Sequence, residues 1–209
     1  MKKLFLVIMA LSLLLVTGCG KESLSSQEQG SGYTVVDARG KKITFTSAPK
    51  RIVCLNYSAT DILTDLIPTE RIIATDMWAR EEDLSNCYEK LKGIPVCENN
   101  PEQIMKFNPD IVILTEGRAN ELADTLDSVG IKTCVLRQPK TIQEIPDYIK
   151  IVGEVADTKA AADSLAEKVA AYIKASAGGQ KIESVLLIHP NGGIGQKGSM
   201  PASICEACN

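Results

Sequence analysis

Short apolar runs alternate with amphipathic segments between Arg51 and Arg137. The apolar runs have the length and β-branched content of buried strands, and the segments between them repeat apolar residues at helical spacing. Alternation of this kind predicts βαβ units and a mostly parallel sheet covered by helices, which is the α/β class. The predicted strands are "RIVCL", "RIIAT", "DIVIL" and "IKTCVL", and the predicted helices are "SATDILTDLI", "NPEQIMKFN" and "RANELADTLDSVG".

Different patterns flank this region. Before it, "YTVVDARGKKITF" has two β-rich runs around Arg39-Gly40, which predicts a hairpin because glycine supplies the positive φ of a tight turn. After it, residues 141–157 and then 158–177 are helical in pattern, with Thr158 as a candidate N-cap. The second helix, of about 19 residues, would be roughly 29 Å long. A further strand is predicted over residues 183–189, followed by a glycine-rich turn.

The N-terminus has the pattern of an export signal. The apolar run from Leu4 to Val16 follows two lysines and is shorter than the roughly 20 residues that span a membrane. The segment Val16-Thr17-Gly18-Cys19 resembles the lipobox of bacterial lipoproteins, in which the cysteine is acylated. We therefore expect a signal peptide over residues 1–18, a lipid anchor on Cys19 and a flexible tether over residues 19–32. An ordinary signal peptide with a chance cysteine is the alternative.

Charge and histidine content exclude several classes of function. The chain has 23 Lys and Arg against 26 Asp and Glu, a net charge of −3, with no basic block, so no nucleic-acid partner is expected. His189 is the only histidine, which leaves no base for a nucleophile and too few ligands for bare zinc or manganese. The sequence predicts no enzyme, no catalytic residues, no metal site and no cofactor besides lipid on Cys19.

Seven cysteines are present, and six remain after Cys19. Cys54 and Cys134 lie in strand-like runs and are predicted to be buried packing residues. Cys87 and Cys97 flank a loop-like region, and the sequence allows either a disulfide or two free thiols. The CxxC at Cys205 and Cys208 has neither a second CxxC nor a thioredoxin-like context, and the sequence does not settle its redox state.

The order of these elements resembles one protein family. The resemblance is carried by "PKRIVCLNYSATDILTDL", "NPEQIMKFNPDIVIL", "LDSVGIKTCVL" and the helical block from "TIQEIPDYI" to "AEKVAAYIKA". These segments resemble the substrate-binding lipoproteins of ABC transporters that import iron-siderophores, haem and cobalamin. The resemblance implies two Rossmann-like lobes joined by one long helix, with the ligand held between them.

On this resemblance, residues 33–140 form the N-terminal ligand-binding lobe and residues 141–178 a helical segment that includes the inter-lobe helix. Residues 179–209 match only the start of a C-terminal lobe, so we expect a truncated second lobe and poor order after Gly178. The implied function is capture of a metal chelate (iron-siderophore, haem or corrinoid) outside the cytoplasm and its delivery to an ABC permease. The alternatives are a thiol-redox lipoprotein that uses Cys205 and Cys208, and a non-functional receptor fragment.

Candidate ligand contacts lie where predicted strands end, since ligands of parallel sheets bind at the carboxyl ends of the strands. Asn56, Tyr57 and Ser58 follow the first strand, where backbone N–H groups favour an anionic or carbonyl-bearing ligand. The structural alternative is that Ser58 caps the helix and Asn56 makes a turn. Trp78 and Arg80 follow the second strand and are predicted to stack on a chelate and to pair with a carboxylate, unless Trp78 only covers the core edge.

Two further groups complete the predicted site. Glu116 and Arg118 follow the third strand, and Arg118 is a candidate anion contact, although both also suit a solvated surface. Glu102 matches the position at which the family places a carboxylate that docks on the permease. Its position at a helix start would equally favour a negative charge there.

Overall fold

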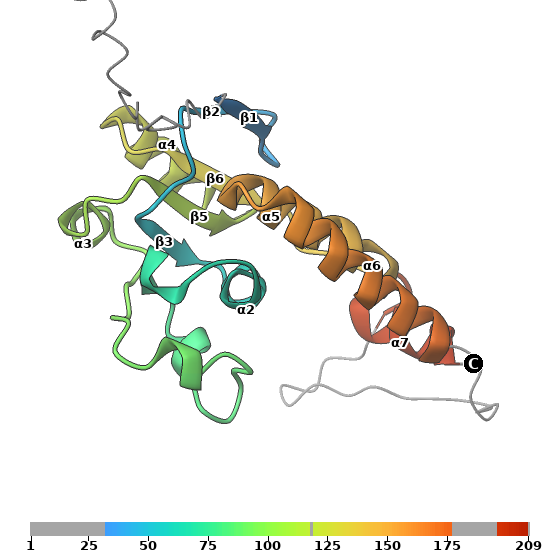
Figure 1. The fold of residues 1–209 in the computed structure, drawn as a ribbon. Helices are drawn as coiled ribbons and strands as arrows, with labels where there is room; N and C mark the ends of the chain where they lie inside the picture. Colours follow the sequence, from blue (N-terminus) through green and yellow to red (C-terminus); the bar gives the residue numbers. More distant parts are fainter. Residues whose placement is uncertain (1–31, 118, 177–195, 209) are drawn as a thin grey trace, which may run out of the picture. The chain divides into compact units, whose positions relative to one another are not determined.

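The computed structural model describes residues 32–117, 119–176 and 196–208 (Figure 1). The predicted signal peptide, Cys19 and most of the tether lie outside the described residues, as do Arg118 and the strand predicted over residues 183–189 with its His189. No helix of the described part is both long and apolar enough to cross a membrane.

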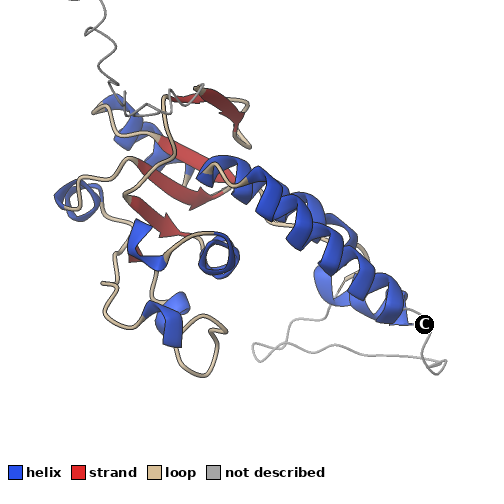
Figure 2. Ribbon diagram, viewed as in Figure 1, coloured by secondary structure: helices blue, strands red, loops and turns tan. Residues whose placement is uncertain are grey.

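A parallel four-stranded sheet lies at the centre of the α/β region (Figure 2). Its strands lie in the order β4-β3-β5-β6, and each neighbouring pair is parallel. All four predicted apolar runs are strands, which confirms the α/β class. The strands are β3 (Ile52–Leu55), β4 (Ile72–Thr75), β5 (Ile111–Thr115) and β6 (Thr133–Leu136).

Helices cover both faces of this sheet, because successive strand residues point to opposite sides. Ile52 and Cys54 join the apolar cluster under α2 and α5, whereas Val53 and Leu55 join the cluster under α3 and α4. The sheet is therefore the middle of three layers. The α-helices are α2 (Tyr57–Leu66), α3 (Pro101–Lys106), α4 (Asn120–Ser128) and α5 (Ile145–Ala156), and the 3₁₀ helices are η2 (Thr69–Arg71), η3 (Trp78–Arg80), η4 (Glu89–Leu91) and η5 (Ile142–Glu144).

The predicted hairpin is present as β1 (Tyr33–Val36) and β2 (Lys42–Phe45), which pair antiparallel. Its turn contains Gly40 at φ +78°, as the sequence indicated. The turn attaches to the outer edge of β6, where the Ala38 N–H donates to the Val135 carbonyl at 2.8 Å. At the other edge, β4 pairs with the segment at Val96 through a parallel bridge.

Helix α6 (Lys159–Ser176) is the long helix expected after Thr158, and it packs on α5. The two helices approach closely at Gly153, where an added Cβ would lie 2.1 Å from the Cβ of Ala162. Ala162 and Ala166 are the buried residues of α6. Only small side chains fit this crossing.

A helix over the last residues, α7 (Met200–Cys208), was not predicted. Pro201 lies in its first turn, where the missing N–H costs no helical hydrogen bond. Ser203 is buried, and its Oγ accepts a hydrogen bond from the Ile142 N–H at 3.0 Å. The structure therefore has a helix at residues 200–208 where the sequence predicted none, and the expectation of poor order after Gly178 stays a prediction.

Replacing Gly153 by alanine tests the helix crossing. We expect Gly153→Ala to lower the free energy of unfolding by about 1–3 kcal/mol, because overpacking outweighs the helix propensity gained. Chemical denaturation followed by circular dichroism measures this change. The double variant Gly153→Ala/Ala162→Gly removes the clash and should recover part of the loss; equal stability of the single variant and the parent would contradict the crossing geometry.

Candidate ligand-binding cleft

A cavity of about 910 Å³ lies at the carboxyl ends of the strands. It is lined by residues 55–58 at the end of β3 and the start of α2, 76–78 after β4 and 96–99 before α3, with Thr115, Glu116, Ala119 and Gln138. The chain passes from β3 to β4 on one side and on to β5 at the other side of β3. Such a switch point opens a crevice between neighbouring connections, and 910 Å³ is within the range for small-molecule sites.

Asn56, and not Ser58, is the N-cap of α2. The Asn56 backbone is extended (φ −142°, ψ 102°), and its Oδ1 accepts a hydrogen bond from the Ala59 N–H at 3.0 Å. The predicted cap at Ser58 is corrected, because the N-cap lies two residues earlier and Ser58 is within the first turn of the helix. Ser58 still lines the cavity, as predicted for a ligand-edge residue.

The Asn56 side chain joins three parts of the fold. Besides the Ala59 N–H, its Oδ1 accepts hydrogen bonds from Gln138 Nε2 and from the Tyr148 hydroxyl, both at 3.0 Å. Desolvation by burial is the main cause that raises the pKa of Tyr148, so its phenol remains a donor.

The orientation of this amide follows from its partners. A backbone N–H can only donate, so the Asn56 oxygen must face Ala59 and the amide nitrogen must face the other way. Asn56 is 1% exposed, and its Nδ2 is buried without a hydrogen-bond partner among the described residues. Because buried polar groups are normally paired, this donor is a candidate ligand contact.

Tyr57 and Trp78 both line the cavity, as the sequence predicted. The Tyr57 hydroxyl donates to the Leu84 carbonyl at 2.8 Å and so ties α2 to the loop between β4 and α3. Trp78 is 55% exposed in η3, which leaves much of its indole available for stacking. Asp76 Oδ1 accepts from the Ala79 N–H at 3.0 Å, and desolvation raises the pKa of this carboxyl group.

Arg80 has a different role from the predicted one. Its guanidinium donates to the carbonyls of Leu91 and Ile94 and lies 5.9 Å from the centre of the Tyr88 ring. It is not among the residues that line the cavity. The predicted pairing of Arg80 with a ligand carboxylate is corrected, because the guanidinium is used to hold the loop together.

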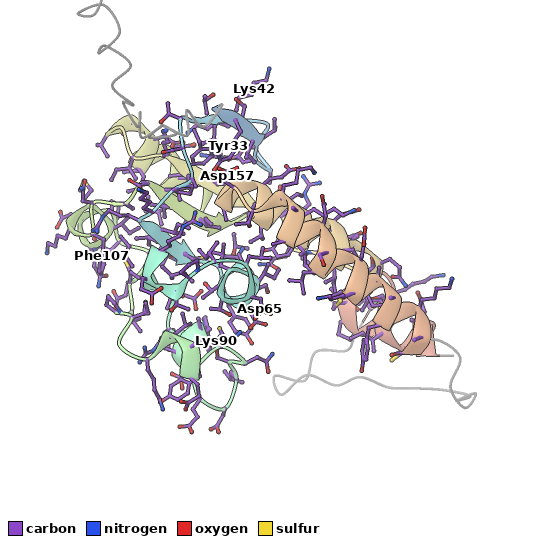
Figure 3. The ribbon with its side chains drawn as sticks, in the orientation of Figure 1. Tyr33, Lys42, Asp65, Lys90, Phe107 and Asp157 are labelled. Carbon is purple, nitrogen blue, oxygen red and sulfur yellow. The ribbon has the colours of Figure 1, made fainter. Side chains whose placement is uncertain are left out.

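The same loop is also linked to α2 by an ion pair between Lys90 and Asp65, which lie near one another in Figure 3. Both side chains are about half exposed, so this pair contributes little free energy on its own. Together with the Tyr57 hydroxyl, it fixes the position of the loop that carries Trp78.

Glu116 lines the cavity, and its carboxylate accepts two hydrogen bonds from Arg137, at 3.0 and 3.3 Å. Glu102 is exposed in the first turn of α3, whose N-cap is Asn100. A role of Glu102 in docking on a permease stays a prediction. Sequence reasoning missed other lining residues, among them Met77, Val96, Glu98 and Gln138.

The buried cysteines are free thiols. Cys54 and Cys134 are fully buried in the sheet, which confirms their predicted packing role. Cys87 belongs to the cluster under α2 and α5 and Cys97 to the cluster under α3 and α4, so this structure has the free-thiol alternative and not a disulfide. Among the described residues, no group of three or more His, Cys, Asp or Glu is placed to hold a metal ion.

An α/β lobe with a ligand-sized cavity at its strand ends can hold a small molecule. A sequence model of the periplasmic binding protein family matches residues 52–195, and the chain belongs to this family. Membership favours the solute-binding role over the thiol-redox alternative and implies a location outside the cytoplasm.

Two curated relatives are similar in sequence. The chain is 24% identical over 176 residues to the uncharacterized ABC transporter substrate-binding lipoprotein YvrC of Bacillus subtilis, covering 78% of this chain and 54% of that protein. It is 24% identical over 129 residues to a cobalamin-binding protein of Halobacterium salinarum, covering 62% and 35%. The chain thus spans about half or less of the length of these relatives.

Solved structures share the fold. A possible iron-binding periplasmic solute-binding protein from Staphylococcus epidermidis matches with a TM-score of 0.62 at 21% identity, covering 78% of this chain and 66% of that chain. The heme binding protein HmuT matches with a TM-score of 0.58 at 21% identity, covering 69% and 47%.

Truncating Asn56 tests its structural role. We expect Asn56→Ala to lower the free energy of unfolding by about 2–4 kcal/mol, because a helix cap is lost and buried donors lose their acceptor. The matched control Asn100→Ala removes the exposed N-cap of α3 and should cost only about 1 kcal/mol. Equal losses in the two variants, measured by denaturant unfolding, would contradict the buried network.

Thiol reactivity tests the cysteine assignment. Desolvation raises the pKa of Cys54 and of Cys134 to about 12 and that of Cys97 to about 11. At pH ~8 these thiols should therefore resist alkylation in the folded protein and react only after unfolding. Peptide mapping by mass spectrometry identifies each labelled cysteine, and a Cys87–Cys97 linked peptide without reductant would refute the assignment.

Proposed function

We propose that this protein is an extracytoplasmic substrate-binding lipoprotein that captures a metal chelate and delivers it to an ABC import permease. The chelate is an iron-siderophore, haem or a corrinoid. The observation that carries the proposal is the cavity at the strand ends with the half-exposed indole of Trp78 at its edge. A large aromatic side chain beside an apolar cavity suits the flat, extended surface of a chelate.

The lining supports an organic ligand in preference to a bare ion. Leu55, Met77 and Val96 contribute apolar surface, and Asn56 and Gln138 contribute amide groups. A bare transition metal would need several converging imidazole, thiolate or carboxylate groups. The names of the relatives, which include a cobalamin-binding and a heme binding protein, support the same class of ligand.

Delivery to a permease rests on the family and on two sequence positions. Cys19 is proposed as the acylated residue that keeps the protein at the membrane, with residues 19–32 as tether. A single acyl chain binds a membrane only weakly, so stable anchoring needs more than one chain on this residue. Glu102, exposed at the start of α3, is the proposed docking carboxylate of this lobe.

Fluorescence of Trp78 tests the proposal, because it is the only tryptophan of the chain. The full chain is titrated with cyanocobalamin, haemin and a ferric hydroxamate, and we expect saturable quenching by at least one of them. Free N-acetyltryptophanamide, titrated in parallel, corrects for absorption by the coloured ligands. Quenching by none of the three beyond this control would overturn the chelate-binding function.

A further inference from the structure

Negatively charged groups outnumber positively charged ones around the cavity. Among the described residues that line it, Asp, Glu, Lys and Arg are represented by Asp76, Glu98 and Glu116, and all three are carboxylates. Arg137 offsets part of the charge of Glu116, whereas Asp76 and Glu98 form no ion pair within the described residues.

Arg80, which the sequence predicted to pair with a ligand carboxylate, does not line the cavity. Arg80 donates to the carbonyls of Leu91 and Ile94 and lies outside the cavity lining. A ligand carboxylate placed in this cavity would therefore meet like charges, and in a partly desolvated cleft such repulsion is screened less than on an open surface.

An independent observation indicates which polar group the ligand presents. The Asn56 Nδ2 group is buried, lacks a hydrogen-bond partner among the described residues, and belongs to a side chain that lines the cavity. Its direction is set by the three donors that hold Oδ1. The N–H of an uncharged amide pairs well with a carbonyl oxygen.

We propose that the cavity selects a chelate of neutral or positive charge that presents an amide or similar uncharged carbonyl oxygen to Asn56 and an apolar surface to Trp78. This inference rests on the proposed function and narrows its ligand class. Chelates whose rim carries several carboxylates are selected against by Asp76, Glu98 and Glu116.

Two pairs of probes, each with one metal-binding core and a different peripheral charge, test the selection. Cyanocobalamin carries peripheral amides, and its acid-hydrolysed derivative carries carboxylates at the same positions. Ferrioxamine B carries a free ammonium group, and its N-succinyl derivative carries a carboxylate instead. Affinities of the full chain are measured by Trp78 quenching at low and high salt. A pair of probes is used for the comparison when at least one of its members binds.

We expect the neutral or cationic member of a pair to bind at least about tenfold more tightly at low salt, and the ratio to shrink at high salt. The triple variant Asp76→Asn/Glu98→Gln/Glu116→Gln should reduce the ratio to within about threefold, because it removes the repelling charges. The control Glu70→Gln, in η2 at the opposite ends of the strands, should keep the parental ratio.

Asn56→Asp tests the carbonyl contact, since aspartate keeps the cap acceptor and lacks the Nδ2 donor. We expect amide-bearing cyanocobalamin or ferrioxamine B, whichever binds, to lose at least about tenfold in affinity. Asn100→Asp makes the same change at the N-cap of α3 and should bind as the parent does. Asn56→Ser, another good N-cap without the amide, serves as a second variant if aspartate unfolds the protein.

The outcomes distinguish failure of the ligand selection from failure of the proposed chelate-binding function. Binding of the carboxylate member as tightly as its partner, or a ratio unchanged in the triple variant, overturns the charge selection and leaves the chelate-binding function standing. Unchanged affinity in a folded Asn56 variant overturns the carbonyl contact. Quenching by haemin and by none of the four probes overturns the inference and leaves the chelate-binding function standing, whereas quenching by neither haemin nor any of the four overturns both.

Discussion

The carboxamide of Asn56 is the interaction on which the cleft depends. One oxygen atom accepts from the first turn of α2, from Gln138 after β6 and from Tyr148 of α5. These groups come from segments up to 92 residues apart in sequence. A buried oxygen with three donors leaves little freedom for rotation, so the end of β3, the start of α2 and the floor of the cavity are positioned together.

The buried amide of Asn56 is a polar group of the cavity, whereas Trp78 and Met77 contribute apolar surface. The amide is held below the surface by the packing of α5 on the sheet, while Trp78 and Met77 are carried by the loop after β4. That loop has its own supports, the Tyr57 hydroxyl and the Arg80 guanidinium. Two separately supported parts of the fold therefore line the cavity: the segment at Asn56 and the loop after β4.

Periodicity was sufficient to predict the sheet, the hairpin and the long helix, because buried strands and amphipathic helices impose strong local patterns. The rule that ligands bind at the carboxyl ends of strands placed Asn56, Tyr57, Ser58, Trp78 and Glu116 correctly at the cavity. Applied after β6, the same rule would have found Gln138.

What the sequence did not show depends on contacts between distant segments. The role of Arg80 is set by the carbonyls of Leu91 and Ile94, in an irregular loop without periodicity. Asn56 and Ser58 both have capping propensity and lie two positions apart, so only the backbone conformation shows that the N-cap is Asn56. Helix α7 was missed because its short sequence carries Pro201 in the first turn and packs on η5.

The attachment of the hairpin at β6 also affects how the edges of the sheet can interact with other chains. A parallel sheet has two outer strands with unpaired backbone groups that can pair with another chain. Here Ala38 covers the outer edge of β6, and the segment at Val96 covers the end of β4. Both margins of the sheet are thus protected against strand-to-strand aggregation, to which partly folded chains are prone.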